Sequence, residues 1–468
     1  MGWFHNGVFN SAKIPEEDGG RVTMKIQKKS YYCISFRLYS PLAVGSGQNE
    51  ETDKDLMRNG NNVPYLPATA IAGVARTLFD IEECRKYFGE VMDSSRAKQA
   101  QKKRQKTSAS SRILFYDANI DKADLDKYRV SRRDSVALDE WKTAKEGAKF
   151  DMEVLEPGIR FVTYMEQNLY EGDEAVAEKI AAAWKAGVFR FGGKTMRGYG
   201  EITDVSVKKV MFCLSKKTDK NVETDELDMA KWLEFNMYND AMWDKQTEWM
   251  GSKLYQSNEC CIELSLKLKG AISIRRYTTG TDVGNEPDFE QLTISGINGK
   301  IPVIPGTTWC GAFRSQIRKL IPGIDESYFG IVSNTEKSKS KIRFGESKLI
   351  GAKEKILMHN AIDRFDGGTI DTALFKERTY YGGTTKLTIS FQTDISDQLL
   401  EALAASIIDL NYGFLSVGGM TGVGRGIFEV ELVNGTKLEK DEKLEVQAAK
   451  QYKQITAILM NLKGECHG

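Results

Sequence analysis

The sequence contains one unusual segment twice, at a long spacing. VPYLPATAIAGVARTLF covers residues 63–79 and IPVIPGTTWCGAFRSQI covers residues 301–317. Each copy is a short apolar run, a proline, two small residues and a stretch of helical pattern that carries an arginine. A second shared segment follows each copy: FRFGGKTMRGYGEI from Phe189 and FLSVGGMTGVGRGIFEV from Phe414. Both segments recur after roughly 230 residues, which predicts two copies of one domain.

Composition agrees with two globular domains. The chain has 468 residues, 41% of them hydrophobic and 28% charged, so each half can bury a core. The formal net charge is only +1, so any polyanion must be bound by local basic patches. The seven cysteines form no CxxC pair, and we expect them to be reduced thiols. We find neither a secretory signal pattern nor an apolar run of about 18 residues, and expect a cytoplasmic protein with no membrane partner.

The sequence patterns of both halves predict the same order of strands and helices. In the first half, alternating residues predict a strand from Tyr31, and a helix follows Pro67 with Thr69 as its N-cap. Strands follow from Ser111 and Phe161, then a helix over 174–187 and a strand after Gly200. Strand, helix, two strands, helix, strand is the ferredoxin-like order of RNA-recognition modules. We therefore predict an α+β protein with two tandem ferredoxin-like domains that carry inserted loops.

These patterns divide the chain into five parts. We expect an N-terminal arm over 1–27, a first domain over 28–215 and a second domain over 259–436. The tryptophan-rich stretch 216–258 reads as a helical connector that packs on the domains or on a partner. The tail 437–468 predicts a further helix.

The glycine-rich loops are the first candidate site. Glycines let the backbone approach a phosphate closely, and guanidinium groups bind phosphates in two-pronged fashion. No GxxxxGK[ST] occurs, which excludes a P-loop, and the loops follow helices and precede strands, which excludes the Rossmann fingerprint. The alternative is that each loop is only a tight turn. The candidate residues are Gly192, Gly193, Lys194, Arg197 and Gly198 in the first half, and Gly418, Gly419, Gly424 and Arg425 in the second.

A basic stretch adds a second candidate. Residues 96–106 hold six Lys or Arg and no acid, and the polar stretch 333–341 occupies the same place in the second half. Either these are solvated surface loops, or they are arms on RNA phosphates whose contribution falls with salt.

With these motifs in place, both halves resemble the RAMP superfamily of CRISPR-associated proteins, specifically the backbone subunits of type III effector complexes. Three motifs carry the resemblance: the proline-plus-helix segments, the glycine loops, and a central stretch. The central stretch is AIDRFDGGTIDTALFKERTYYGG from Ala361, with a looser copy, VALDEWKTAKEGAKFDMEVLEPG, from Val136. Together they cover most of both halves.

The resemblance implies a protein that grips CRISPR guide RNA while base pairing reads a complementary target RNA. Other CRISPR effector subunits are then its partners. The resemblance also implies guide-binding positions besides the loop residues above. They are Gly45, Gly47, Arg76, Gly306, Arg314 and Arg364. Family members usually have a lysine where this chain has Ala72 and Cys310, which puts that one contact in doubt.

The resemblance also implies cleavage of the target RNA by attack of its own 2′-OH. The family uses an aspartate in the loop after the first strand, assisted by Mg²⁺ or another divalent cation. Asp53 is the best match and the tentative metal ligand, with Asp55 as its neighbour. In the second half, counting from Pro305 places the position equivalent to this aspartate near Gln291. Asp288 and Glu290 lie close to it and are weaker candidates. The competing interpretation is that these acids are merely solvated.

Three functions remain open at this stage. The protein is a guide-binding backbone that cuts RNA, a backbone that only binds guide RNA, or an enzyme that processes precursor guide RNA. The third is disfavoured, because such enzymes commonly use histidine and this chain has three, of which we interpret His359 as structural.

Overall fold

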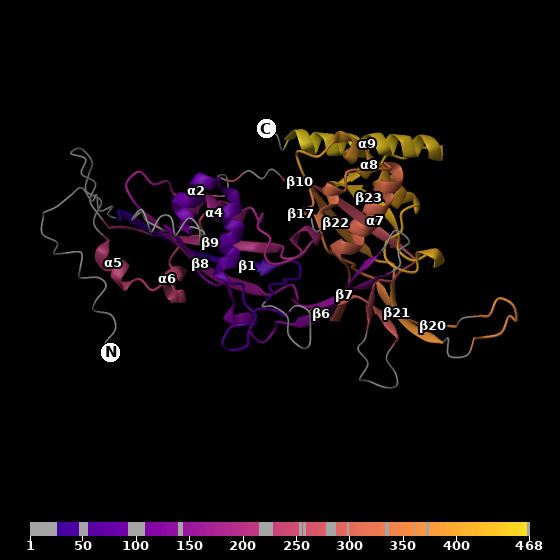
Figure 1. Ribbon diagram of the computed structural model, residues 1–468, viewed down its shortest axis with the longest axis horizontal. Helices are drawn as coiled ribbons and strands as arrows, with labels where there is room; N and C mark the ends of the chain where they lie inside the picture. The colour runs from indigo at the N-terminus through magenta and orange to yellow at the C-terminus, as the bar shows by residue number, and fades with distance from the viewer. Residues whose placement is uncertain are drawn as a thin grey trace, which may run out of the picture.

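The computed structural model describes residues 26–45, 55–91, 108–138, 144–214, 228–251, 255, 259–277, 287–296, 299–332, 337–360, 362–370 and 374–465. Figure 1 shows two bodies side by side along the long axis, which we call the first module (β1 to β9) and the second module (β10 to β24). Residues 1–25 of the N-terminal arm, the basic stretch 96–106, Gly47 and Asp53 lie outside the described residues.

The first module contains a four-stranded antiparallel path in the order β4-β8-β1-β9. Its elements are β1 (Lys28–Leu38), α1 (Ala68–Ala75), η2 (Arg76–Leu78), α2 (Ile81–Phe88), β2 (Glu90–Val91), β3 (Ser108–Ala109), β4 (Ile113–Phe115), β5 (Asn119–Ile120), η3 (Lys122–Asp124), β6 (Val130–Leu138), β7 (Ala144–Leu155), β8 (Arg160–Leu169), α4 (Val176–Lys185), η4 (Thr195–Arg197) and β9 (Ile202–Cys213).

The second module repeats this path as β18-β22-β10-β23. Its elements are β10 (Glu259–Lys269), β11 (Ala271–Ile272), β12 (Arg275–Tyr277), β13 (Phe289–Gln291), β14 (Thr293–Gly296), β15 (Gly299–Ile304), α7 (Gly306–Leu320), η6 (Glu326–Phe329), β16 (Ile331–Val332), β17 (Lys337–Ser338), β18 (Ile342–Phe344), β19 (Ser347–Lys348), β20 (Lys353–His359), β21 (Phe375–Tyr381), β22 (Thr384–Gln392), α8 (Asp397–Tyr412), η7 (Thr421–Val423), β23 (Ile427–Val433) and β24 (Thr436–Lys437). The shared order confirms the predicted tandem ferredoxin-like fold.

Each module has its own core between the sheet and the helices. On β1, Tyr32, Ile34, Phe36 and Leu38 point inward, because side chains of a strand alternate between its two faces. On β10 the matching residues Ile262, Leu264, Leu266 and Leu268 do the same. The buried Trp184 of α4 closes the first core, and α8 packs on β23 in the second.

Thr69 is not the N-cap of α1, contrary to the sequence-based expectation. The helix begins at Ala68, with Pro67 as its N-cap and no side chain of its own as a cap. Instead the carboxylate of Asp117, in the turn between β4 and β5, accepts a hydrogen bond from the Ala68 N–H at 2.7 Å. A residue 49 positions away thus satisfies the helix end, which a local capping rule cannot anticipate.

The connector packs on the first module. Its helices α5 (Met229–Glu234) and α6 (Asp240–Asp244) lie at the end of the molecule away from the second module (Figure 1). Trp232 and Trp243 contact the sheet face opposite α1 and α4, whereas Met229 and Leu233 are exposed.

Two β-hairpins are inserted at matching places. The β6–β7 hairpin of the first module extends to the second, where β6 contacts β12. The β20–β21 hairpin of the second module points away from the body (Figure 1). The C-terminal helix α9 (Leu444–Glu465) lies on α8, with Ile455 and Leu459 buried.

Candidate nucleic-acid interface

Matching backbone hydrogen bonds fix which residues of the two modules are equivalent. The Gly193 N–H donates to the Ala43 carbonyl at 2.7 Å, and the Gly419 N–H donates to the Ser273 carbonyl at 2.7 Å. Both loops also hold one non-glycine residue in the left-handed region, Lys194 (φ 56°) and Met420 (φ 54°). The glycine loops are therefore one structure built twice.

The backbone of these loops is used inside the protein. The N–H groups of Arg197, Gly198 and Gly200 donate to carbonyls of the protein, and the Gly426 N–H donates to the Ala271 carbonyl at 2.8 Å. These groups are not open to a phosphate in this structure, which favours the tight-turn interpretation for the loop backbone. What the first loop presents outward is the exposed side chain of Arg197.

The first glycine loop docks on helix α7 of the second module. A Cβ built on Gly306 would lie 2.1 Å from the Phe344 carbonyl oxygen of the same module and 2.5 Å from the Arg197 carbonyl oxygen, so only glycine fits at the first position of α7. Cys310, one turn further on, is influenced by two guanidinium groups. Burial raises the pKa of its thiol, while the charges of Arg197 and Arg314 oppose that shift. The turn that carries Arg197 packs on α7 from the first module, and Arg314 is the ninth of the 15 residues of that helix.

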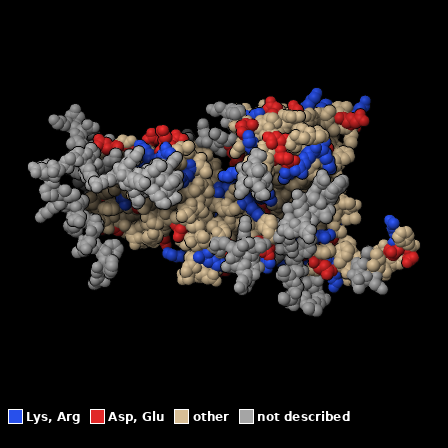
Figure 2. Space-filling view, in the orientation of Figure 1, with Lys and Arg blue, Asp and Glu red and all other residues tan. Residues whose placement is uncertain are grey.

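The residues at this contact have the chemistry that binds a phosphate chain. Helix N-termini favour anions, and arginine binds phosphate oxygens with two parallel N–H donors. Arg314 is held by Glu326, which accepts from its Nε at 3.0 Å, so its position is fixed. Figure 2 shows Lys and Arg side chains gathered at the junction of the two modules. We call Arg197, Arg314 and the N-terminus of α7 the junction site.

A buried ion pair holds the junction together. Arg133 on β6 donates from Nη1 to Glu346 of the second module at 2.5 Å, and both side chains are 3% exposed. Burial lowers the pKa of Arg133, but the combined effect of Glu346, Tyr199 and Glu156 outweighs it, and the net shift is upward. Nearby, burial lowers the pKa of Arg190, and the charge of Arg343 in the second module adds to that shift. Sequence analysis missed both members of the ion pair.

Arg425 of the second loop lies in a different setting from Arg197. It is 6% exposed and donates to the buried carboxylate of Glu377 at 2.7 Å. Glu377 is also in contact with His359 Nε2 at 3.2 Å. The guanidinium of Arg425 therefore ties the glycine loop to the β20–β21 hairpin and is not presented to a ligand in this structure.

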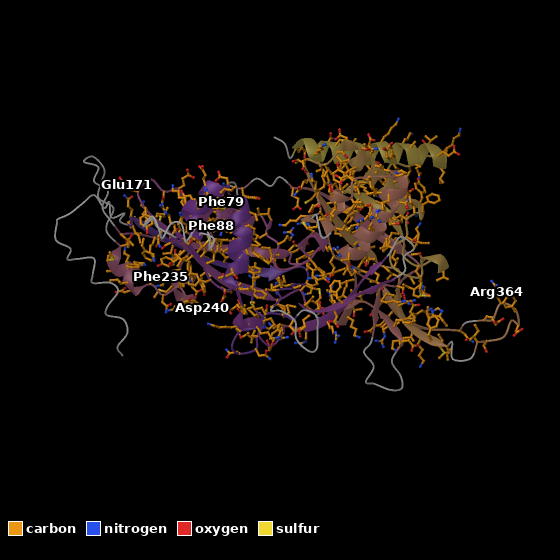
Figure 3. All side chains as sticks on the ribbon, viewed as in Figure 1. Phe79, Phe88, Glu171, Phe235, Asp240 and Arg364 are labelled. Carbon is orange, nitrogen blue, oxygen red and sulfur yellow. The ribbon has the colours of Figure 1, made fainter. Side chains whose placement is uncertain are left out.

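The remaining guide-binding candidates are scattered. Arg76 is exposed at the end of α1, with its guanidinium over the Phe88 ring, 5.8 Å from the centroid. Arg364 lies at the outer end of the β20–β21 hairpin, far from Phe235 and Asp240 at the opposite end of the molecule (Figure 3). Gly45 forms a bridge with Leu56 and so closes the base of the loop that contains Gly47. These positions do not converge with the junction site.

Equivalent backbone pairs in the two modules also show which candidate carboxylates occupy equivalent positions. Gly45 pairs with Leu56, and Arg275 pairs with Gln291. Counting back from Leu56 and Gln291 makes Asp55 equivalent to Glu290 and Asp53 equivalent to Asp288. By this count along the sequence, Asp288 is the counterpart of Asp53.

The two second-module acids differ in their environment. Glu290 is 7% exposed and accepts from Arg378 at 3.0 Å, so it is part of an internal ion pair. Asp288 is exposed and accepts from the Lys376 N–H at 2.7 Å. Asp288 is therefore the better candidate of the pair for contact with a ligand.

The described residues do not fit a metal site. Among them, no group of three or more His, Cys, Asp or Glu side chains is placed to hold an ion. The predicted divalent cation accordingly remains a prediction tied to Asp53, outside the described part of the chain. In that described part, no helix is both long and apolar enough to cross a membrane.

Comparison with known proteins identifies the family. The sequence model of the RAMP superfamily matches residues 35–203 and 249–429, one match in each module. The chain belongs to the RAMP superfamily and carries two tandem RAMP modules.

No curated protein matches the sequence. Among solved structures, one similar chain comes from "Cryo-EM structure of the Type III-B Cmr-beta bound to cognate target RNA". The identity is 14% and the TM-score 0.29, over 38% of this chain and 61% of that one. The chain thus spans less than two thirds of that relative, and the fold assignment rests on the family match and the sheet order.

Proposed function

We propose that this protein is a guide-RNA-binding backbone subunit of a type III CRISPR ribonucleoprotein, working in the cytoplasm with other effector subunits. The observation that carries the proposal is the junction site, where the turn that carries Arg197 of the first RAMP module packs against α7, the helix of the second module that carries Arg314. A backbone phosphate of RNA bound there would bridge both modules, so each junction would grip the guide without reading its bases.

We further propose that Asp53 and Asp288 act on a paired target RNA, one in each module. A carboxylate near a target 2′-OH could orient that hydroxyl for attack on the adjacent phosphate. The competing function is a backbone that binds guide RNA without cutting. For the second module it is favoured by Asp288 already holding the Lys376 N–H.

The first experiment purifies the protein co-expressed with its neighbouring genes and sequences the RNA bound to it. Short RNAs that share one repeat-derived end would support the proposal. No RNA, or a random mixture that leaves at moderate salt, would contradict it.

Point variants then test the junction site itself. Arg197→Glu should weaken binding of single-stranded RNA and reduce the steepness of its salt dependence by at least about 0.7 in the log–log slope, the value for one phosphate contact. Lys245→Glu is the matched control, because Lys245 is an exposed cation on the connector. Equal effects of the two variants in fluorescence anisotropy would show that the junction site is not where RNA binds.

A further inference from the structure

The surface by which the first module docks on the second is repeated, uncovered, on the second module. Gly198 and Gly424 end the same turn in the two loops, with φ of 82° and 81°. A Cβ on Gly198 would lie 2.6 Å from the Glu346 N atom of the second module. A Cβ on Gly424 would meet nothing within 4 Å among the described residues. The same turn is thus an interface in one module and open in the other.

The open surface also carries apolar side chains. Val423 holds the position of Arg197 and is 69% exposed, and Phe414, at the start of the same loop, is 77% exposed. Large exposed apolar side chains near a repeated docking surface indicate a binding site for protein.

The opposite end of the chain is closed by its own connector. The Trp232 Nε1–H donates to the Tyr31 hydroxyl at 2.9 Å, the Phe235 ring lies 5.1 Å from the Tyr31 ring, and Trp243 is 3% exposed. Tyr31 is on the outer sheet face of the first module, where it pairs with Glu166.

The equivalent face of the second module is used differently. Matching registers place Cys261 and Ser390 where the first sheet has Tyr31 and Glu166. Arg343, which donates to the Ser390 hydroxyl at 2.8 Å, is 5% exposed, and the Lys348 Nζ lies 5.1 Å from the ring centroid of Tyr39 in the first module. The outer face that receives a preceding module in the second sheet is therefore covered by the connector in the first.

A second difference points the same way. Ala68 occupies the position of Gly306, the residue whose α-carbon lies against the Arg197 carbonyl. The Cβ of Ala68 would obstruct a loop approaching α1 in the way that the first loop approaches α7. The first module of a second copy would therefore meet a steric obstacle as the receiving side.

We propose that the connector is a cap that leaves this chain with one open end, and that the Met420–Gly424 loop receives a RAMP module of a different chain. The proposal rests on the proposed function, because it names the next subunit of that complex. The partner module would present an uncovered outer sheet face and a glycine, or another residue without a bulky side chain, at the start of its first helix.

The test places a photo-crosslinking p-benzoylphenylalanine at position 423 in the full chain, co-expressed with its neighbouring genes. The expected result is a crosslink to a RAMP module of another protein, identified by peptide mass spectrometry. The same group at Leu233, which is 63% exposed on the outside of the cap, is the control and should give no crosslink between chains. In addition, Val423→Asp should reduce recovery of that partner about tenfold, equivalent to about 1.4 kcal/mol, while guide RNA recovery is unchanged.

Other outcomes overturn the proposal. A crosslink from position 423 to a second copy of this chain, to RNA or to a protein without a RAMP module would do so, as would an assembled complex with no crosslink at all. If neither partner nor guide RNA is recovered with the wild-type chain, the proposed function itself fails. If guide RNA is recovered and Val423→Asp changes nothing, only the open-end proposal fails.

Discussion

Arg133 of the first module and Glu346 of the second form a two-pronged ion pair, with Nη1–Oε2 and Nη2–Oε1 distances of 2.5 and 3.4 Å. The pair joins residues 213 positions apart, and the ring of Tyr199 lies 5.6 Å from the Arg133 guanidinium. Glu346 is the counterpart of Asp117, which caps α1 within the first module. The carboxylate at this position caps a helix of its own module in the first module, and in the second module it forms the ion pair between modules.

Removing one partner of this pair should be costly. Glu346→Gln keeps the size of the side chain but leaves the buried Arg133 with the more distant carboxylate of Glu156, at 3.5 Å, as its counter-charge, and we expect a loss of about 1–3 kcal/mol in the free energy of unfolding. Chemical denaturation followed by tryptophan fluorescence measures it. Arg133→Met combined with Glu346→Met should cost clearly less than the sum of the single changes.

The matched control is Arg132→Met, whose side chain is 45% exposed in its pair with Asp151. That change should cost about 0–1 kcal/mol. A Glu346→Gln protein as stable as Arg132→Met would show that the pair does not hold the modules together.

The two equivalent glycines should respond differently to alanine. Gly198→Ala and Gly424→Ala introduce the same left-handed strain of about 1 kcal/mol, because their φ values agree. Only Gly198→Ala also forces a Cβ against the backbone of the neighbouring module. We therefore expect a lower melting temperature for Gly198→Ala than for Gly424→Ala in scanning calorimetry. Equal melting temperatures would mean that the close approach at Gly198 is not present in solution.

The reactivity of Cys310 should report on the junction site. Because burial raises the pKa of this thiol, the reactive thiolate is scarce near neutral pH, and alkylation should still accelerate as the pH rises beyond 9. Arg197→Ala removes a charge that lowers the pKa, so it should slow iodoacetamide labelling at fixed pH, measured by mass spectrometry of the Cys310 peptide. Bound RNA should slow it further.

Lys245→Ala, which changes a cation on the connector, should leave the labelling rate of Cys310 unchanged. A rate that is insensitive to Arg197→Ala would place the two side chains apart in solution and remove the basis of the junction site.

Cleavage should separate by module if the carboxylate proposal holds. Asp53→Ala should abolish one cut in a target RNA and Asp288→Ala another, with guide binding intact, because each acid serves its own module. Sequencing gels of a labelled target with the purified complex would show the two positions. Glu290→Gln is a poor test, since Glu290 is bound to Arg378 inside the fold and its change would disturb the structure.

Retention of both cuts in the Asp53→Ala, Asp288→Ala double variant would leave the protein as a backbone that binds guide RNA without cutting.

Local pattern was sufficient for much of the fold. The alternation of apolar and polar residues from Tyr31 to Leu38 predicts a strand with one buried face, and the spacing of apolar residues around Trp184 predicts a helix with one buried face. The repeated proline and glycine segments indicate the duplication. These patterns involve residues that are close in sequence, so they can be recognised without knowing which surface each element packs against.

The candidate site was predicted less well, because its residues act across long separations. In the sequence, Arg425 has the features of a phosphate ligand in a glycine-rich loop. In the structure it forms an ion pair with the carboxylate of Glu377 on β21. Asp288 and Glu290 could not be told apart until the strand pairing of Arg275 with Gln291 set the register.

The sequence by itself determined that the chain is two copies of one α+β module with glycine-rich loops and a helical connector, since periodicity and repetition are local properties. Only the tertiary structure decided that Arg197 meets α7, that Arg133 meets Glu346, and that the connector covers the first sheet. Those contacts join residues whose encounter depends on how whole modules pack, and burial and charge at that interface have no signature in any short stretch of sequence.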